Sequence, residues 1–454
     1  MSKRFAWLFG VAVLLAIGAL VACGSNYDPS SNGLVLVASQ GSGLIETFSF
    51  NLYNGHLSEI SNTPIDTSND VCVLKGIPSA LVVDPSGNYA YTILSQNNTL
   101  CPNGGTQGIQ AFKINSDGNA PTVGGPVGFN SPAGVNANMV PYSMVMDPSG
   151  KFLFVADRAT TDKSGNNISG SVSVFAIGSG GSIKEVPGSP FVPTPQTIVP
   201  KTSIDIVGVA PTPTVFPKIG LNAVQNAVCQ AIGTTPPTTE YLYAVDGLGN
   251  QVFEFKVNTS TGVLTNPTTS IGLPSFPTDQ IPAGVAVDPC DRFVYVSNSL
   301  SNKVSAYTIC NGYATQSPTN CPKSPLPPDG SLVPIAGSPF SLSGSSNQPG
   351  PILVDPYGNN VYVLGTLSNT ISQLKISQVS GELAAMTPAT VATGVGPAGM
   401  AIRADDNWLF VTNYGSVGLG GNTMSQYSIT PATGALSVLP SVPTDNYPSG
   451  VAVK

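Results

Sequence analysis

The sequence predicts an all-β protein, a seven-bladed β-propeller of four-stranded antiparallel blades. Three observations predict this fold: a turn-rich composition, a hairpin motif that recurs along the chain, and a pair of large apolar residues that recurs seven times. Repetition of a four-stranded unit around a ring is typical of propellers, because the ring leaves only short and protected strand edges.

The composition is that of a turn-dense chain with a core. Of the 454 residues, 49 are glycine and 41 are proline, and only 9% are charged. Hydrophobic residues nevertheless reach 41%. A disordered low-complexity chain lacks that much apolar material, so the composition favours a folded β protein.

One recurring unit is an apolar strand, a tight turn related to Asp-Pro-x-Gly, and a second apolar strand. Its five copies span residues 80–92, 143–156, 284–297, 352–364 and 399–412. Proline at the second turn position and glycine at the fourth are typical of a type I turn between antiparallel strands. We therefore expect the turn aspartates to cap their own hairpins and not to act as catalytic acids. They are Asp84, Asp147, Asp288 and Asp355.

A second unit follows each hairpin and contains two large apolar residues at positions i and i+2. The pairs are Phe48 and Phe50, Phe112 and Ile114, Phe175 and Ile177, Phe255 and Val257, Tyr307 and Ile309, Leu374 and Ile376, and Tyr427 and Ile429. This spacing places both side chains on one face of a strand, where they can pack between neighbouring sheets. Seven pairs, about 63 residues apart on average, predict seven blades.

The two ends of the chain complete one another. Residues 447–454 match only the first strand of a repeat, whereas the segment from residue 34 begins with what corresponds to a second strand. We expect the ring to close by pairing the C-terminal strand with the N-terminal blade, whose other three strands come from residues 34 to about 65. The propeller is therefore predicted to span residues 34–454.

Residues 191–241 break the pattern. They contain no Asp-Pro-x-Gly hairpin, and apolar residues in 219–233 have a spacing closer to that of a helix. Long insertions are usually surface decorations but can also carry specificity. We expect a decoration here.

The first residues resemble a secretory signal. Lys3 and Arg4 precede an uncharged apolar run that ends at Cys23, which predicts a signal peptide over residues 1–22. The sequence Leu-Val-Ala-Cys at residues 20–23 resembles the lipobox of bacterial lipoproteins. That resemblance implies a lipidated Cys23, with residues 23–33 as the lipidated cysteine and tether; an uncleaved transmembrane anchor is the alternative. Gly24 in place of aspartate, by resemblance to enteric lipoproteins, favours export to the outer membrane.

Charge and cysteine content agree with export. Removal of residues 1–22 takes away two of the 17 basic residues and none of the 24 acidic ones, which gives a net charge near −9 and disfavours nucleic acid as a partner. The six remaining cysteines suggest disulfides. Sequence alone does not determine their pairing, but the repeat register favours Cys72 with Cys101, Cys310 with Cys321, and Cys229 with Cys290. A zinc site is disfavoured because no two of these cysteines have C-x2-C spacing.

The Asp-Pro-x-Gly hairpins, the strands ending in Asn298 and Asn413, and the turn containing Thr433, Gly434 and Leu436 resemble the seven-bladed lactonase family. That family includes propeller-type 6-phosphogluconolactonases, and its repeats are similar to those of surface-layer propellers. The resemblance covers nearly all of residues 34–454. It rests on turn formers and core residues, so it implies the fold more specifically than the activity.

Opening a lactone requires an activated water and a stabiliser of the oxyanion, and a phosphorylated substrate also requires cations. The family resemblance implies histidine, glutamate and arginine at one mouth of the channel. The single histidine, His56, aligns with a turn at the opposite rim, so we expect no histidine base. Asp157 and Arg158 are the candidate catalytic base and anion clamp.

Further polar residues fall at the same mouth and are candidate ligand-binding residues: Asp246, Asn298, Asn413, Lys75 and Lys163. Capping and solvation of loops is the simpler interpretation of each. Oxygen atoms in residues 157–167 could bind calcium, but their spacing matches no known calcium loop, so no metal or cofactor is expected.

Phosphorylated sugar lactones are made in the cytoplasm, and an exported enzyme would be separated from them. We therefore expect a monomeric, lipid-anchored envelope propeller that binds a glycan, a small-molecule lactone or an envelope protein. A lactone hydrolase is the alternative, and a structural surface-layer element is a third. A mouth rich in asparagine, serine and aromatic residues would favour binding, and one with concentrated charges would favour an enzyme.

Overall fold

The computed structural model describes residues 32–60, 77–95, 107–130, 139–161, 167–193, 204–212, 240–266, 275–310, 321, 329–344, 347–415 and 421–454. Over these ranges the regular structure is β-strand, apart from one short 3-10 turn, η1 (Ser179–Gly181). None of the helical structure in them is long and apolar enough to span a bilayer. Residues 1–31, with the predicted signal peptide and Cys23, lie outside the described part.

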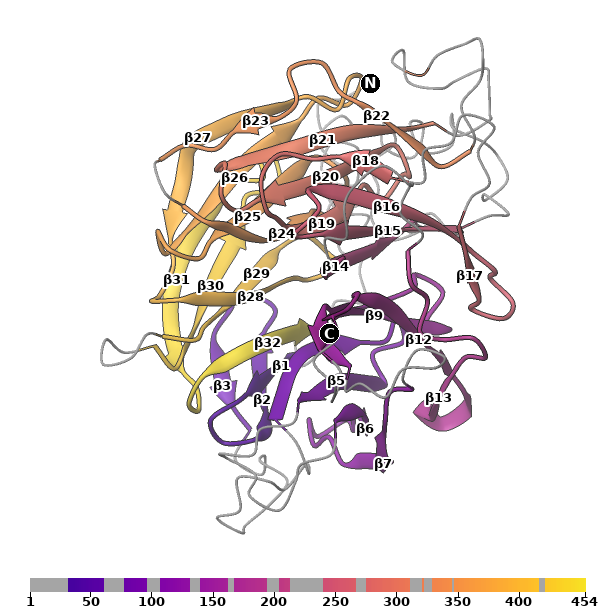
Figure 1. Ribbon diagram of the computed structural model, residues 1–454. Helices are drawn as coiled ribbons and strands as arrows, with labels where there is room; N and C mark the ends of the chain where they lie inside the picture. The colour runs from indigo at the N-terminus through magenta and orange to yellow at the C-terminus, as the bar shows by residue number, and fades with distance from the viewer. Residues whose placement is uncertain are drawn as a thin grey trace, which may run out of the picture.

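Seven four-stranded antiparallel sheets form the blades, numbered here along the chain (Figure 1). Blade 1 contains β32 (Pro448–Val453), β1 (Asn32–Ser39), β2 (Leu44–Asn51) and β3 (Leu57–Glu59). Blade 2 contains β4 (Ile77–Val83), β5 (Tyr89–Ser95), β6 (Gly108–Lys113) and β7 (Thr122–Val127). Blade 3 contains β8 (Val140–Met146), β9 (Phe152–Arg158), β12 (Ser171–Ile177) and β13 (Ile183–Glu185).

The remaining blades repeat this order of first, second, third and fourth strand. Blade 4 contains β14 (Ile206–Pro211), β15 (Glu240–Asp246), β16 (Gln251–Val257) and β17 (Leu264–Thr265). Blade 5 contains β19 (Pro282–Val287), β20 (Phe293–Asn298), β21 (Lys303–Cys310) and β22 (Ser331–Pro334). Blade 6 contains β24 (Pro349–Val354), β25 (Asn360–Gly365), β26 (Thr370–Ile376) and β27 (Leu383–Ala392), and blade 7 contains β28 (Pro397–Ile402), β29 (Trp408–Asn413), β30 (Thr423–Ile429) and β31 (Leu436–Pro443).

The ends of the described chain close the ring as predicted. β32, yellow in Figure 1, pairs antiparallel with β1, which is indigo, with Val451 opposite Val37. The backbone N–H of Lys454 donates to the carbonyl oxygen of Leu34 at 2.8 Å. The first strands of successive blades contact one another around the ring. The N-terminal segment of blade 1 supplies three strands and ends at Glu59, somewhat before the predicted limit.

The five predicted hairpins are confirmed as β4–β5, β8–β9, β19–β20, β24–β25 and β28–β29. Their turn aspartates cap the turns, as expected; the backbone N–H groups of Asn88 and Tyr89 both donate to Asp84 Oδ1 at 2.8 Å. The fourth turn residue is left-handed, with φ of 69° at Gly87 and 55° at Asp291. Glycine adopts that conformation without a steric cost, which explains its place in the motif.

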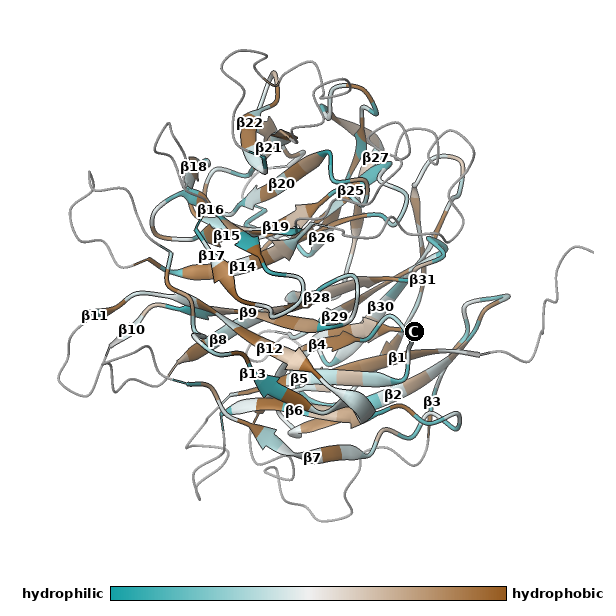
Figure 2. Cartoon of the chain, turned by 90° about the vertical axis from the view of Figure 1, so that its right-hand side faces the viewer, coloured by the Kyte–Doolittle hydropathy of each residue, from teal (hydrophilic) through white to brown (hydrophobic). Residues whose placement is uncertain are grey.

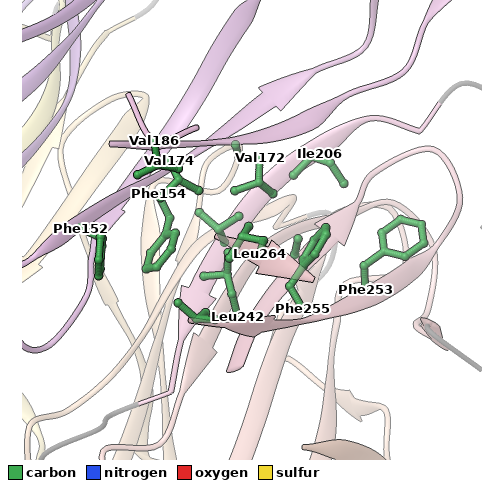
Figure 3. Packing of buried hydrophobic residues seen from close by; sticks show 14 of the residues in the cluster. Phe152, Phe154, Val172, Val174, Val186, Ile206, Leu242, Phe253, Phe255 and Leu264 are labelled. Carbon is green, nitrogen blue, oxygen red and sulfur yellow. The ribbon is translucent and has the colours of Figure 1, made fainter. Parts of the chain in front are cut away.

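The core lies between the blades. The seven predicted apolar pairs fall on third strands, except that Ile114 directly follows the end of β6, and apart from Ile177 every member is buried. In the cluster between blades 3 and 4, Phe154 and Val174 face Leu242 and Phe255 (Figure 3). β9 and β14 are hydrophobic along most of their length, which suits strands covered on both faces (Figure 2).

The interpretation of residues 191–241 as decoration is wrong for one part of that segment. Residues Ile206–Pro211 form β14, the innermost strand of blade 4, and its partner β15 begins only at Glu240. The usual short hairpin turn is replaced by a long connection, and for that reason the motif search missed the strand. Residues 213–239, with the helix-like spacing and Cys229, lie outside the described residues.

Four further short strands accompany the blades. β10 (Thr160–Thr161) and β11 (Asn167–Ile168) pair with each other after the second strand of blade 3. β18 (Ser275–Pro277) and β23 (Phe340–Ser341) pair with the third strands of blades 4 and 5. In both of those blades the outer edge is therefore shared by two short strands.

One predicted disulfide is confirmed. Cys310, the last residue of β21, is bonded to Cys321 with a Cα–Cα distance of 5.7 Å. Cys290 is also disulfide-bonded. Its predicted partner Cys229, like Cys72 and Cys101, lies outside the described residues, so these two pairings remain predictions.

Candidate functional site

One end of the ring gathers the residues that the sequence singled out. Second strands end there and first strands begin there, whereas the β-hairpin turns between first and second strands lie at the opposite end. We call the first end the mouth. Asp157, Asp246, Asn298 and Asn413 occupy the same register position near the mouth end of β9, β15, β20 and β29, each paired with the start of its first strand.

Asp157 is fully buried within blade 3. Its Oδ2 accepts hydrogen bonds from the hydroxyls of Ser173 at 2.7 Å and Ser171 at 3.2 Å, while its Oδ1 has no hydrogen-bond partner. Burial raises the pKa of the Asp157 carboxyl to about 7, against the lowering effect of the two serines. The group can hold a proton near neutral pH, but solvent does not reach it.

Arg158 points outward beside Asp157 and is already paired. Its Nη2 lies 2.7 Å from Asp205 Oδ2, and its guanidinium lies 5.1 Å from the centre of the Tyr142 ring. The Arg158 side chain remains 44% exposed, whereas Asp205 is buried. Arg158 thus joins blade 3 to the loop that leads into blade 4, and its carboxylate partner weakens it as a clamp for another anion.

The other three residues at this register position form hydrogen bonds with nearby residues of their own blades or of the loops beside them. Asp246 accepts from the backbone N–H of Asp205 at 2.9 Å and from Gln251 Nε2 at 3.0 Å. Asn298 donates to Ser305 Oγ at 3.0 Å, and Asn413 donates to Ser425 Oγ at 2.9 Å. All three are buried, and Lys75 and Lys163 lie outside the described residues. The assignment of all five residues to ligand binding remains a prediction.

Glu46 is a mouth residue that the sequence reasoning missed. It occupies, in blade 1, the position at which blades 5 and 7 carry Ser305 and Ser425. Its Oε1 accepts from Ser39 Oγ at 3.0 Å and from the backbone N–H of Asp445 at 2.6 Å, and its Oε2 has no partner. A glutamate where the repeat places serine is a signal that alignment of the blades could have found.

Burial and, to a smaller extent, the charge of Asp445 raise the pKa of the Glu46 carboxyl to about 8. Glu46 is therefore protonated near neutral pH, 2% exposed, behind an exposed aspartate. A carboxyl with a pKa close to neutrality is the kind of group that serves in general acid–base chemistry.

Next to Glu46, two tyrosines and three amides form a cluster at the mouth, which we call the tyrosine–amide cluster: Tyr414, Tyr447, Gln40, Asn422 and Asn446. The two tyrosine rings lie 5.1 Å apart, and the Tyr414 hydroxyl donates to Gln40 Oε1 at 3.3 Å. Asn422 Oδ1 accepts the backbone N–H of Tyr447 at 3.0 Å, and its Nδ2 donates to Asn446 Oδ1 at 2.9 Å. Tyr447 is 44% exposed.

The backbone at the mouth is strained at repeated positions. Ile281, Gln348 and Tyr447 have φ of 52°, 45° and 58°, and each directly precedes the proline that begins a first strand. Side chains other than glycine rarely adopt this conformation, at a cost of about 1–3 kcal/mol each. Strain of this kind concentrates at functional sites, where surrounding contacts hold a side chain in place.

Exposed apolar side chains also gather at the mouth. Seven of the exposed large hydrophobic residues lie at this end, two at the start of β8 and five in turns and loops: Val140, Tyr142, Leu248, Ile281, Leu300, Leu367 and Tyr447. The side chains that reach solvent at this end include these apolar and aromatic groups and the amides of the cluster, together with the charged Arg158, Lys303 and Asp445. Clustered exposed apolar groups mark binding surfaces.

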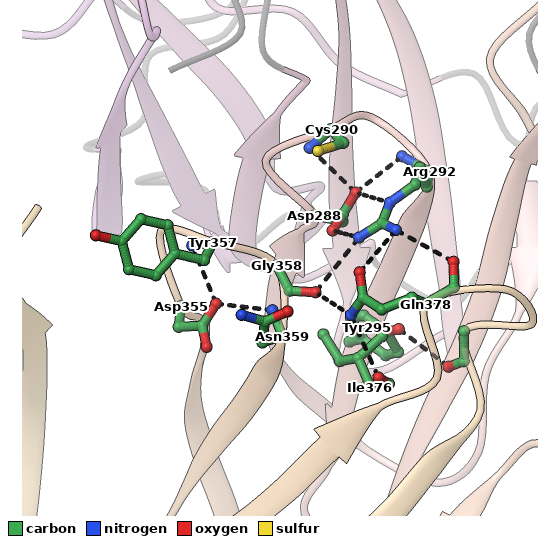
Figure 4. A network of polar contacts seen from close by, with 11 residues as sticks. Asp288, Cys290, Arg292, Tyr295, Asp355, Tyr357, Gly358, Asn359, Ile376 and Gln378 are labelled. Atoms are coloured by element: carbon green, nitrogen blue, oxygen red, sulfur yellow. Dashed lines mark hydrogen bonds and ion pairs between the residues drawn. The ribbon is translucent and has the colours of Figure 1, made fainter. Parts of the chain in front are cut away.

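The opposite end contains structural ion pairs. Arg292 is 5% exposed; it pairs with Asp288 at 2.7 Å and donates to Gln378 Oε1 at 3.0 Å, which joins the hairpin of blade 5 to blade 6 (Figure 4). His56 also lies at this end, in the exposed turn between β2 and β3, where its Nδ1 is 3.4 Å from Ser58 Oγ. Within the described ranges, no three His, Cys, Asp or Glu side chains are grouped as metal ligands would be.

Residues 233–319 and 337–453 match the family described as Lactonase, 7-bladed beta-propeller. In these two ranges the chain is similar to the repeats of the seven-bladed lactonase family. The matched residues include β15 to β17 of blade 4, β19 to β21 of blade 5, the strands of blades 6 and 7, and β32. No curated protein sequence matches this lactonase-type propeller.

Solved structures show the same fold. A protein from Bacteroides fragilis described as a candidate 6-phosphogluconolactonase superposes with a TM-score of 0.61 at 17% identity. The match covers 95% of this chain and 100% of that one. A periplasmic gluconolactonase from Pseudomonas aeruginosa gives a TM-score of 0.59 at 16% identity, over 93% of this chain and 99% of that one. At these identities the similarity of the lactonase-type propeller to them is one of fold.

Proposed function

We propose that this lactonase-type propeller is an exported, lipid-anchored binding protein that holds an uncharged saccharide or similar polar ring at its mouth. The observation that carries the proposal is the tyrosine–amide cluster, in which the ring of the exposed Tyr447 stands beside Tyr414 and three amides. A tyrosine ring offers an apolar face to a sugar ring, and amide groups can donate to and accept from its hydroxyls.

The surrounding chemistry supports binding over hydrolysis. The predicted base, Asp157, is fully buried, and the predicted clamp, Arg158, is engaged with Asp205. Aromatic, apolar and amide groups are exposed at the mouth beside the charged Arg158 and Asp445. An uncharged ligand would not need the cations that a phosphorylated lactone requires.

Export and lipidation at Cys23 are part of the same proposal. The Cys310–Cys321 disulfide supports an oxidising compartment, because such bonds are rare in the cytosol. The gluconolactonase of Pseudomonas aeruginosa with the same fold is periplasmic. Labelling of the expressed protein with a radioactive fatty acid, with Cys23→Ala as the control, tests the anchor; label that persists in the variant would refute it.

Calorimetric titration of residues 24–454 with neutral oligosaccharides tests the ligand class. We expect binding that a Tyr447→Ala variant weakens by about tenfold, because loss of one stacked ring removes on the order of 1 kcal/mol. Tyr53→Ala is the matched control: Tyr53 is 83% exposed, in a turn away from the mouth. Equal losses in both variants, or no binding by the unaltered chain, would refute the proposal.

Lactone hydrolysis is the second candidate, and Glu46 is the observation that favours it. A protonated carboxyl beside the tyrosine–amide cluster could protonate the leaving alkoxide of a lactone bound there. A turnover assay on sugar and aliphatic lactones tests this candidate, with Glu46→Gln and Asp157→Asn as variants. Activity that Glu46→Gln abolishes would make the protein a hydrolase, and activity unchanged in both variants would exclude these two residues.

A further inference from the structure

Each of the seven first strands has a register irregularity near its mouth end, where it pairs with the second strand of its blade. Bulges of this kind re-aim a side chain, and they are over-represented next to active sites. Five first strands skip one residue and two skip a pair: Ser449, Tyr142, Val207, Ala283 and Ala398, then Ser79 with Ala80 and Gly350 with Pro351.

Tyr142, in blade 3, is the one aromatic residue in this set. It is 52% exposed, although the guanidinium of Arg158 lies 5.1 Å from the centre of its ring. Val207 is buried, and the other skipped residues are small. Blade 3 therefore presents an aromatic ring to solvent at a position where the other blades present no large exposed side chain.

Arg158 holds the Tyr142 ring in place and leaves no uncompensated charge beside it. Its Nε and Nη2 donate to the buried Asp205 at 3.2 and 2.7 Å, and Asp205 also accepts the backbone N–H of Ala159 at 2.9 Å. A cation near the face of an aromatic ring is attracted to it. The ring is thus ordered before a ligand arrives, which lowers the entropic cost of binding.

We propose that Tyr142 forms a second ring-binding subsite of the mouth, so that the ligand is an extended neutral oligosaccharide and not a single ring. This inference rests on the proposed function, which places one sugar ring at the tyrosine–amide cluster. The Asp205 carboxylate offsets the charge of Arg158, so the second subsite also suits an uncharged ring.

The positions of the two subsites set the minimum size of the ligand. Tyr447 directly precedes the first strand of blade 1, and Tyr142 lies in the first strand of blade 3. Blade 2 separates them, because β32 contacts β4 and β4 contacts β8. Packed sheets lie roughly 10 Å apart, so two steps around the ring exceed the width of one pyranose ring.

The test compares ligands of different length. Residues 24–454, which contain every described strand, are titrated with glucose and cellohexaose, and with N-acetylglucosamine and chitohexaose, by ligand-observed NMR. We expect at least one hexasaccharide to bind about tenfold more tightly than its single ring, because a second stacked ring adds its own contribution.

Variants separate the two subsites. Tyr142→Ala is expected to weaken hexasaccharide binding about tenfold and to leave binding of the single ring unchanged, because that ring binds at the tyrosine–amide cluster. Tyr142→Phe keeps the aromatic ring and is expected to retain full affinity. Tyr447→Ala is expected to weaken binding of both probes, and Tyr53→Ala, in an exposed turn at the opposite end, to weaken neither.

The outcomes distinguish this inference from the proposed function. Binding that Tyr447→Ala weakens, but that neither chain length nor Tyr142→Ala changes, would refute the second subsite and leave the proposed function intact. Absence of binding by every probe would refute both.

Discussion

Carboxyl side chains have different roles in this propeller, depending on how many hydrogen-bond donors surround them. Asp84 and Asp147 accept backbone N–H groups within their own turns, as the sequence predicted. Glu46 and Asp157 are buried with one oxygen unpartnered, and burial raises the pKa of each carboxyl. Buried carboxyls with a raised pKa, such as Glu46 and Asp157, make the stability of the protein depend on pH.

The chain is expected to lose stability as pH rises from about 5 to 8. The pKa of Glu46 is about 8, and burial raises the pKa of Glu240, Glu254 and Asp406 to about 8 as well. Because the unfolded chain releases these protons at lower pH than the folded one, the stabilisation is complete below the unfolded pKa, near 4, and is lost as pH rises through the folded value.

A Glu46→Gln variant isolates one of these groups. Amide in place of carboxyl removes its titration, so denaturant unfolding at pH 5 and pH 8 should show a smaller loss in the variant, by up to about 1.4 kcal/mol per pH unit across the window. Glu382→Gln, in an exposed turn, is the control. The account of Glu46 is wrong if the variant keeps the full pH dependence.

The Arg292–Asp288 pair provides a prediction at the opposite end. Arg292→Met should cost about 3 kcal/mol of unfolding free energy, because it leaves the fully buried Asp288 without its cation. Arg403→Met is the matched control in blade 7, where Arg403 and its partner Asp405 are partly exposed, and should cost about 1 kcal/mol or less. Urea midpoints measure both, and equal losses would contradict the assignment.

Residue-level prediction succeeded where contacts are local. An aspartate that caps its own turn is encoded within five residues, and four of the five hairpins show it. Arg158 and Asp205 are 47 positions apart, and only the fold brings them together. Glu46 and Asp445 are separated even further along the chain and meet because the ring closes.

At the scale of elements, the hairpin motif identified first and second strands wherever a short turn joins them. β14 was missed because its partner β15 follows a long connection, and nothing in its own six residues marks it as innermost. The third strands were the most predictable, because their paired large residues must fill the space between blades.

Close packing of the first strands makes another prediction. A Cβ added to Gly450 in β32 would lie 2.0 Å from the carbonyl oxygen of Ser79 in β4, the first strand of blade 2. Gly450→Ala should therefore push these strands apart and cost at least about 1–3 kcal/mol. Gly125→Ala in β7 is the control, because a Cβ there has no neighbour within 4 Å. Thermal unfolding of both variants tests the prediction, and equal stability would contradict it.

At the scale of the whole molecule, closure joins the two ends of the described chain. At the mouth it places Glu46 and Gln40 from the N-terminal strands beside Asp445 and Tyr447. The sequence predicted closure and the mouth as the functional end, but the contacts across the closing seam depend on residues some 400 positions apart.

The central claim is that the mouth binds an uncharged ring ligand without opening it. Saturation-transfer NMR on a mixture of neutral saccharides and sugar lactones, with residues 24–454, measures binding and hydrolysis in one sample. The account predicts saturation transfer to at least one ring, loss of that transfer in Tyr447→Ala, and lactone decay at the protein-free rate. Faster lactone decay that Glu46→Gln abolishes, or no transfer to any ring, would contradict it.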